Sequence, residues 1–196
     1  TLLVPDNLPS WADETLTLLE WPESKVERGT SSAYHIDQLL IPSFPDLLPE
    51  DYRWIRQQIL EEASTAQPLI EPNKNIYISR SNAIERRVIN EKEIMEMLSK
   101  YDFELVCLEE NTILQNSKTF SNADVIIGPH GAGLTDLIFC TDSTVVELFG
   151  SKIKPPYERL ASVLNVEYTS LKCTPKSTDI VVNPERLDSK IKQIIK

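Results

Sequence analysis

The sequence predicts an α/β fold, a Rossmann-like parallel sheet with helices on both faces, preceded by an irregular N-terminal segment. From residue 75 onward, short aliphatic runs alternate with segments of helical periodicity, as expected for strands that alternate with helices. One such run, at 125–127, leads into a glycine-rich loop at 128–133, and then the start of a helix is expected. Strands and helices that alternate in this way form parallel sheets covered on both faces. A glycine loop between strand and helix is typical of phosphate binding.

The first 48 residues hold several prolines and only short apolar runs, such as the one at 38–41. Proline interrupts regular structure, so this segment is expected to be irregular, with one or two strands. An amphipathic helix is predicted at about 49–64, because apolar residues recur there at helical spacing among charged ones. These apolar residues are Tyr52, Ile55, Ile59 and Leu60.

This organisation predicts two parts. Residues 1–65 would belong to, or connect to, an N-terminal domain, and residues 66–196 would form a Rossmann-like domain that binds a nucleotide or another phosphorylated small molecule. A loop is expected over 66–74, where no periodic pattern is present.

The elements of the second part follow in order along the chain. Strands are predicted at 76–78, 105–108, 125–127, 144–148 and 166–168. Helices are predicted to begin at Asn90, at Leu134 and at Pro184, and to span 112–120 and 157–164. Asn90 is expected to cap its helix, because Glu93 follows at the spacing of a capping box.

Composition and charge exclude several classes of partner and site. The net charge is −10, and no basic stripe is present, so a nucleic-acid partner is not expected. No apolar run approaches the length that spans a bilayer, so no membrane span is expected in this chain. The three cysteines lie far apart with no Cys-x-x-Cys spacing, which argues against a disulfide framework or a zinc site. Together with the absence of an Asn-x-Ser/Thr sequon, this favours a cytoplasmic location.

Four segments, taken together, resemble glycosyltransferase family 61. They are Ile78-Ser79-Arg80, Arg86-Arg87-Val88-Ile89-Asn90-Glu91, the loop Gly128-Pro129-His130-Gly131-Ala132-Gly133-Leu134-Thr135, and Val146-Glu147-Leu148. This family includes bacterial capsular polysaccharide proteins and eukaryotic xylosyl-, arabinosyl- and N-acetylglucosaminyltransferases. The resemblance covers residues 75–150 well and the flanks loosely.

The resemblance implies half of a GT-B architecture, in which two Rossmann-type domains face each other across a cleft. The C-terminal domain of such an enzyme holds the nucleotide-sugar donor, and residues from about 75 would form it. The family's histidine-containing motif on the acceptor side has no counterpart here. The resemblance therefore implies a missing N-terminal domain and leaves the catalytic base unassigned.

Arg80 and His130 are the candidate catalytic residues. Arg80 follows the first strand of the sheet, and open α/β sheets bind ligands at the carboxyl ends of their strands. Its guanidinium would hold the donor diphosphate and stabilise the leaving nucleotide, whereas the alternative is a surface ion pair. His130 lies in the glycine loop and would donate to a phosphate or a sugar hydroxyl, whereas the alternative is a structural histidine.

The predicted donor-binding residues include Arg80 and the glycine loop. Backbone N–H groups of Gly131, Ala132 and Gly133 would cradle phosphate, although the glycines also fit an ordinary turn. Thr135 would cap the helix or contact phosphate. Of Arg86 and Arg87, one is expected to reach the phosphates while the other pairs at the surface, and Arg87 is chosen.

Glu147 is the last predicted donor-binding residue. It lies in the apolar strand 144–148, where a carboxylate is costly to bury without partners. It would accept hydrogen bonds from both ribose hydroxyls, as the acidic residue of a dinucleotide fold does, or it would face solvent on an edge strand. The resemblance favours the ribose contact.

The predicted function is a glycosyltransferase that moves a sugar from a nucleotide-sugar to a hydroxyl of a glycan or a protein-linked acceptor, in polysaccharide biosynthesis. A UDP-linked donor is among the candidates. The resemblance implies an inverting enzyme of GT-B type, and because no Asp-x-Asp motif is present, it is expected to need neither a metal nor another cofactor. The alternative is a non-catalytic nucleotide-binding or assembly module in a polysaccharide synthesis complex. Either protein would be cytoplasmic, with membrane association through a parent complex, or would lie in the Golgi or ER lumen of a eukaryote.

Overall fold

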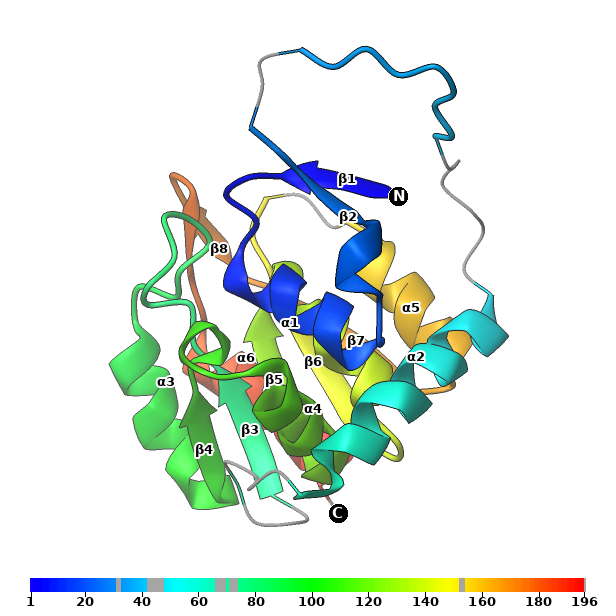
Figure 1. The fold of residues 1–196 in the computed structure, drawn as a ribbon. Helices are drawn as coiled ribbons and strands as arrows, with labels where there is room; N and C mark the ends of the chain where they lie inside the picture. Colours follow the sequence, from blue (N-terminus) through cyan, green and yellow to red (C-terminus); the bar gives the residue numbers. More distant parts are fainter. Residues whose placement is uncertain (31–32, 42–47, 66–69, 71–73, 152–153, 196) are drawn as a thin grey trace.

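The computed structural model describes residues 1–30, 33–41, 48–65, 70, 74–151 and 154–195 (Figure 1). Five strands form its central sheet, and every neighbouring pair in that sheet is parallel. They are β3 (Lys74–Ile78), β4 (Phe103–Val106), β5 (Ala123–Pro129), β6 (Thr144–Phe149) and β7 (Glu167–Lys172). Across the sheet they lie in the order β4-β3-β5-β6-β7.

Helices cover both faces of this sheet. The helices α3 (Glu91–Leu98) and α6 (Pro184–Ile194) pack on one face. The helices α2 (Pro49–Glu62), α4 (Ile113–Asn122) and α5 (Pro156–Leu164) pack on the other, together with the 3₁₀ helix η5 (Ala132–Phe139). Because side chains alternate along a strand, neighbours such as Ile76 and Tyr77 enter opposite cores, and both are fully buried. The predicted Rossmann-like α/β fold is confirmed.

The strand order creates a switch point between β3 and β5. From β3 the chain moves to β4 on one side and then returns to β5 on the other side. In open α/β sheets, ligands bind in the crevice outside the carboxyl ends of strands at such a point. Arg80 follows the end of β3 and His130 follows the end of β5, so the topology brings the two predicted catalytic residues to this crevice.

The N-terminal segment is more regular than predicted. The strands β1 (Leu2–Pro5) and β2 (Val26–Gly29) form a separate parallel pair, as the expectation of one or two strands allows. The helix α1 (Ser10–Leu18) was not predicted, and it has no buried residue. The predicted helix at 49–64 is confirmed as α2, which contributes Ile59 to the core beside the sheet. The division of the chain at 65 remains a prediction.

Two predicted elements differ from the structure in type or in extent. The helix after the glycine loop is 3₁₀ rather than α-helical, and the strand expected at 105–108 ends at Val106. Most of the loop expected over 66–74 lies outside the described residues.

Asn90 lies at the N-cap position of α3, but its side chain makes no capping hydrogen bond. Its amide instead pairs with the backbone of Val182, donating to the carbonyl at 2.8 Å and accepting from the N–H at 3.0 Å, and it also donates to Glu93. The capping box of the structure belongs to α4, where Thr112 and Gln115 satisfy each other's backbone N–H groups. The side chain of Asn90 therefore pairs with the distant Val182 backbone in place of the backbone of its own helix.

The hairpin of β8 (Thr174–Lys176) and β9 (Asp179–Val181) was also not predicted. Each of its strands has only three residues, too few to show a period. It joins the body through Ile180, whose N–H donates to the carbonyl of Arg87 at 2.9 Å. The hairpin therefore reaches the carboxyl end of the sheet and forms part of the site described next.

Candidate functional site

The guanidinium of Arg80 lies directly against the backbone of Gly131. A Cβ at residue 131 would lie 2.3 Å from Nη1 and 2.8 Å from Cζ of Arg80, closer than real Cβ contacts. The φ of Gly131 is 172°, an extended conformation open to any residue. This glycine is therefore required for space and not for its conformational freedom, as when a backbone approaches another group closely.

Arg80 and Arg86 both present buried N–H groups without acceptors. Within the described part of the chain, neither Nε has a hydrogen-bond partner. Arg86 keeps an ion pair with Glu85 at 2.9 Å, whereas Arg80 Nη2 donates a long hydrogen bond of 3.5 Å to the carbonyl oxygen of Glu85. Burial lowers the pKa of Arg80, and the positive charge of Arg86 lowers it further. A buried donor without an acceptor costs about 1–3 kcal/mol, so this pair of cations is suited to bind an anion.

His130 is held by a buried carboxylate and two aromatic rings. Its Nδ1 lies 2.5 Å from Oε1 of Glu147, which is fully buried on the adjacent strand β6. Its ring stacks on Phe149, with centroids 5.2 Å apart, and Tyr157 approaches at 5.5 Å. The hydroxyl of Tyr168, on β7, donates to Oε2 of Glu147 at 2.5 Å.

The protonation of Glu147 reflects two opposing effects. Burial raises the pKa of Glu147, while the hydrogen bonds with Tyr168 and His130 act in the other direction. Both carboxylate oxygens are thus engaged by protein groups. These partners differ from the ribose hydroxyls that the sequence predicts for this residue.

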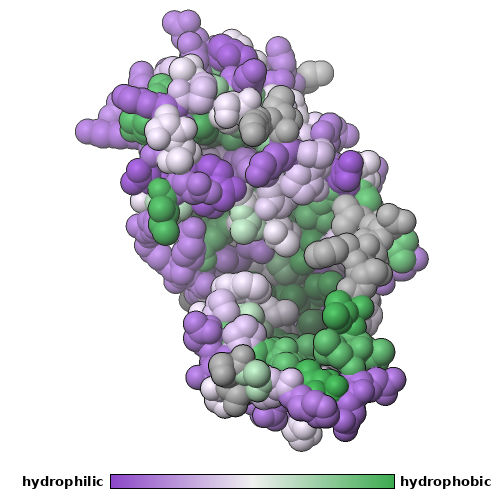
Figure 2. All heavy atoms as spheres, turned by 90° about the horizontal axis from the view of Figure 1, so that it is seen from above, coloured by the Kyte–Doolittle hydropathy of each residue, from purple (hydrophilic) through white to green (hydrophobic). Residues whose placement is uncertain are grey.

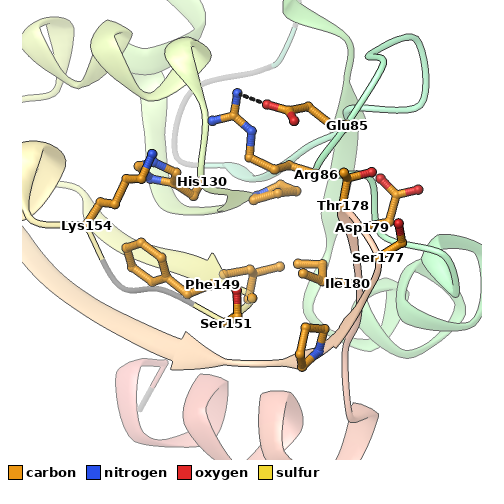
Figure 3. Close-up of a pocket in the computed structure, with 14 residues that line it drawn as sticks. Glu85, Arg86, His130, Phe149, Ser151, Lys154, Ser177, Thr178, Asp179 and Ile180 are labelled. Carbon is orange, nitrogen blue, oxygen red and sulfur yellow. Dashed lines mark ion pairs between the residues drawn. The ribbon is translucent and has the colours of Figure 1, made fainter.

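A pocket of about 280 Å³ opens beside His130 (Figure 3). Figure 3 shows His130 and Lys154 on one side of it and Thr178, Asp179 and Ile180 of the hairpin on the other. The pocket therefore combines cationic groups with the wall that β8 and β9 provide. Its charged lining residues are Glu85, Arg86, Lys154 and Asp179.

A second, larger hollow of about 890 Å³ lies beyond Tyr157. It is formed by Tyr52 of α2, by Thr135 of η5, by Pro155 and by residues along most of α5. Burial raises the pKa of Tyr157, and a hydrogen bond with Thr135 opposes that rise. The space-filling view from above shows a hollowed surface with hydrophobic side chains gathered along one side of it (Figure 2).

The structure brings some predicted residues together and separates others. Arg80, His130 and Gly131 meet at the crevice, and Ala132 and Gly133 begin η5 beside them. A Cβ at Gly133 would lie 2.7 Å from Leu108 Cδ1, so that glycine also permits a close approach.

Arg87 does not line the pocket itself but pairs with Asp179, which does. Its guanidinium contacts Asp179 at 2.7 Å, and its backbone N–H donates to the same carboxylate at 2.9 Å. Arg86 lines the pocket instead. The phosphate contact chosen for Arg87 remains a prediction, and the geometry favours Arg86 for that position.

Sequence reasoning missed Tyr168, Phe149 and Lys154. Phe149 could have been predicted from the sequence, because it lies two residues after Glu147 and therefore shares a face of the same strand. Tyr168 could not have been predicted, because its partner Glu147 lies 21 residues away on another strand. Lys154 lies between the strand and helix that were predicted, in a segment without a periodic pattern.

The Glycosyltransferase 61 family model matches residues 2–146, which is more than half of the chain. The chain belongs to the glycosyltransferase 61 family. This glycosyltransferase 61 chain is 34% identical over 96 residues to the EGF domain-specific O-linked N-acetylglucosamine transferase of Drosophila melanogaster, a match that covers 47% of this chain and 18% of that protein. It is 30% identical over 139 residues to the protein O-linked-mannose beta-1,4-N-acetylglucosaminyltransferase 2 of Homo sapiens, covering 65% of this chain and 23% of that protein. The chain thus spans less than a quarter of the length of either relative.

Two further properties of the glycosyltransferase 61 chain concern membranes and metals. None of the helices in the described ranges has the length and apolar character that a membrane span requires. In the same residues, no group of three or more His, Cys, Asp or Glu side chains is arranged to hold a metal ion.

Proposed function

We propose that this chain is the donor-binding part of a glycosyltransferase, which moves a sugar from a nucleotide-sugar to an acceptor hydroxyl. Membership of the glycosyltransferase 61 family supports the reaction class. Both relatives are named as transferring N-acetylglucosamine, one to EGF domains and one to O-linked mannose on proteins. We therefore propose UDP-N-acetylglucosamine as the donor and a protein-linked hydroxyl as the acceptor.

One observation carries the proposal: the buried N–H groups of Arg80 and Arg86 that lack acceptors at the switch point. Buried donors are nearly always satisfied, so such a pair indicates a ligand that supplies acceptors. A diphosphate supplies several anionic oxygens, and a guanidinium binds them with two parallel hydrogen bonds. His130 and the amides of the glycine loop lie next to this position.

The proposed reaction is a displacement at the anomeric carbon of the donor. The acceptor oxygen forms a bond to this carbon, the bond to the phosphate oxygen breaks, and its electron pair leaves with the nucleoside diphosphate. Arg80, Arg86 and His130 would stabilise the negative charge that develops on the departing phosphate. In this proposal the enzyme is inverting and of GT-B type. It is independent of metal, because cationic side chains neutralise the leaving group. The base that accepts the proton of the acceptor is not assigned.

Calorimetric titration with UDP and with UDP-N-acetylglucosamine tests the proposal. We expect Arg80→Ala to weaken UDP binding by more than about tenfold, because it removes a charge-assisted contact. Lys100→Ala is the control, since Lys100 is an exposed cation that precedes β4 at the opposite edge of the sheet. If the native chain fails to bind UDP, the proposal is wrong.

A transfer assay then separates an enzyme from a binding module. Suitable acceptors are a peptide that carries O-linked mannose and a folded EGF domain, as the names of the relatives indicate. Transfer to either acceptor supports the enzyme. Binding of UDP without transfer favours the non-catalytic nucleotide-binding module.

A further inference from the structure

The carboxylate of Glu147 is buried behind His130. It is fully buried on β6, a strand whose other residues, apart from Thr144, are apolar. Burying a carboxylate is costly unless hydrogen bonds compensate, and here both of its oxygens receive one. A carboxylate that is buried at this cost behind a histidine of the pocket is suited to fix the orientation and the protonated nitrogen of that histidine.

We propose that Glu147 and Tyr168 are positioning residues that hold His130 with a proton on Nδ1 and with Nε2 directed to the donor diphosphate. This inference rests on the proposed function, because it names the ligand group that the positioned histidine contacts. Neither Glu147 nor Tyr168 contacts the donor itself. Their effect on donor binding passes through His130.

The hydrogen bonds determine the direction of this arrangement. The phenol of Tyr168 donates to Oε2, so the carboxylate is anchored by a donor on one side. If the carboxylate is ionised, Oε1 accepts from His130, and the imidazole proton lies on Nδ1. When one ring nitrogen is bound to a carboxylate, the other becomes the nitrogen that is available to a ligand.

The aromatic neighbours hold the plane of the ring. Phe149 stacks on it with an interplanar angle of 23°, and Tyr157 covers a second side at 59°. Only 13% of the His130 side chain is exposed. In the described structure Nε2 has no hydrogen-bond partner, and His130 lines the pocket that Arg86 and Lys154 also line. The free nitrogen and the cations therefore serve the same pocket.

A direct ribose contact by Glu147 does not fit this geometry. Ribose hydroxyls would have to reach a side chain with 0% exposure and displace either the phenol or the imidazole. The positioning role needs neither change.

Nitrogen-15 NMR of the imidazole rings tests the inference without any assay of transfer. The chain has only two histidines, and the ring of His35 is 94% exposed, so it serves as an internal reference. At pH 8 we expect His130 to show a proton on Nδ1, with that proton far downfield because a carboxylate accepts it in a short hydrogen bond. If Nδ1 carries no proton and Nε2 does, Glu147 is the donor of the pair and the inference is wrong.

Three variants separate positioning from ordinary packing. Glu147→Gln removes the charge and is expected to abolish the downfield Nδ1–H signal and to weaken UDP binding about tenfold, the loss of one well-placed hydrogen bond. Tyr168→Phe keeps the ring and is expected to shift the same signal. Tyr101→Phe is the matched control, because it removes a phenol that donates to Asp188 at 2.7 Å, and His130 should not respond. A downfield signal that survives unchanged in Glu147→Gln would overturn the inference.

Addition of UDP to the labelled native chain distinguishes this inference from the proposed function. We expect the Nε2 resonance of His130 to move while His35 stays unchanged. If UDP binds and His130 does not respond, the inference is wrong and the proposed function stands. If UDP does not bind while Nδ1 carries the proton, the proposed function and the donor contact of His130 are wrong, and only the geometry of the pair is supported.

Discussion

Gly131→Ala isolates the contact between the glycine loop and Arg80. The new Cβ would lie 2.3 Å from Nη1, 2.8 Å from Cζ and 3.3 Å from Nε of Arg80, so one of the two residues must move. The backbone at 131 needs no positive φ, and the atoms that the Cβ meets are the end of a flexible side chain. We therefore expect Arg80 to leave its place while the stability of the fold changes by less than about 1 kcal/mol.

The size of the effect on binding follows from the contact that is lost. A hydrogen bond to a charged group contributes about 1.5–3 kcal/mol, so UDP affinity should fall about 10- to 100-fold. Calorimetry on Gly131→Ala, on Arg80→Ala and on the double variant measures this. Because both substitutions act through the same guanidinium, the double variant should bind no more weakly than Arg80→Ala alone.

Gly29→Ala is the control for a glycine outside the pocket, since a Cβ there would lie 3.2 Å from the carbonyl oxygen of Val4. Chemical unfolding of each variant shows whether the fold is intact. The reasoning is refuted if Gly131→Ala binds UDP within about twofold of the native chain while Arg80→Ala does not.

Three further predictions concern protonation, helix capping and the neighbouring arginines. Burial raises the pKa of Asp136 to about 7, so the folded chain binds more protons than the unfolded one from about pH 4 to pH 7, and its stability falls as the pH rises. Urea unfolding at pH 5 and at pH 8 measures this fall in the free energy of unfolding, and Asp136→Asn should reduce the fall by about 2–4 kcal/mol. An equal fall in the two proteins would contradict the prediction. Thr112→Ala removes the capping box of α4 and should lower the free energy of unfolding by about 1 kcal/mol, with no change if the cap is redundant. Arg86→Ala should weaken UDP binding about tenfold and Arg87→Ala by less than about threefold, and the reverse order in calorimetry would restore Arg87 as the phosphate ligand.

Sequence reasoning succeeded where the cause is local. The runs at 125–127 and 144–148 are strands because their β-branched residues suit a sheet with two covered faces, and β5 and β6 contain them. The placement of Arg80 and His130 followed as well, since the carboxyl ends of parallel strands meet at one edge. The Asn90 cap failed because Val182, far along the chain, offered its amide a better pair of partners than the helix did.

The sequence alone determined the order of the five strands of the central sheet and of the helices between them, the glycine loop and the side chains that follow those strands, because periodicity and glycine content act within a few residues. Only the tertiary structure decided which groups those side chains meet. In the structure Glu147 contacts His130 and Tyr168, the latter 21 residues away in the sequence, and Arg87 pairs with Asp179, which is 92 residues away. The partner of a polar side chain depends on which distant strands become neighbours, and sequence spacing carries no record of that.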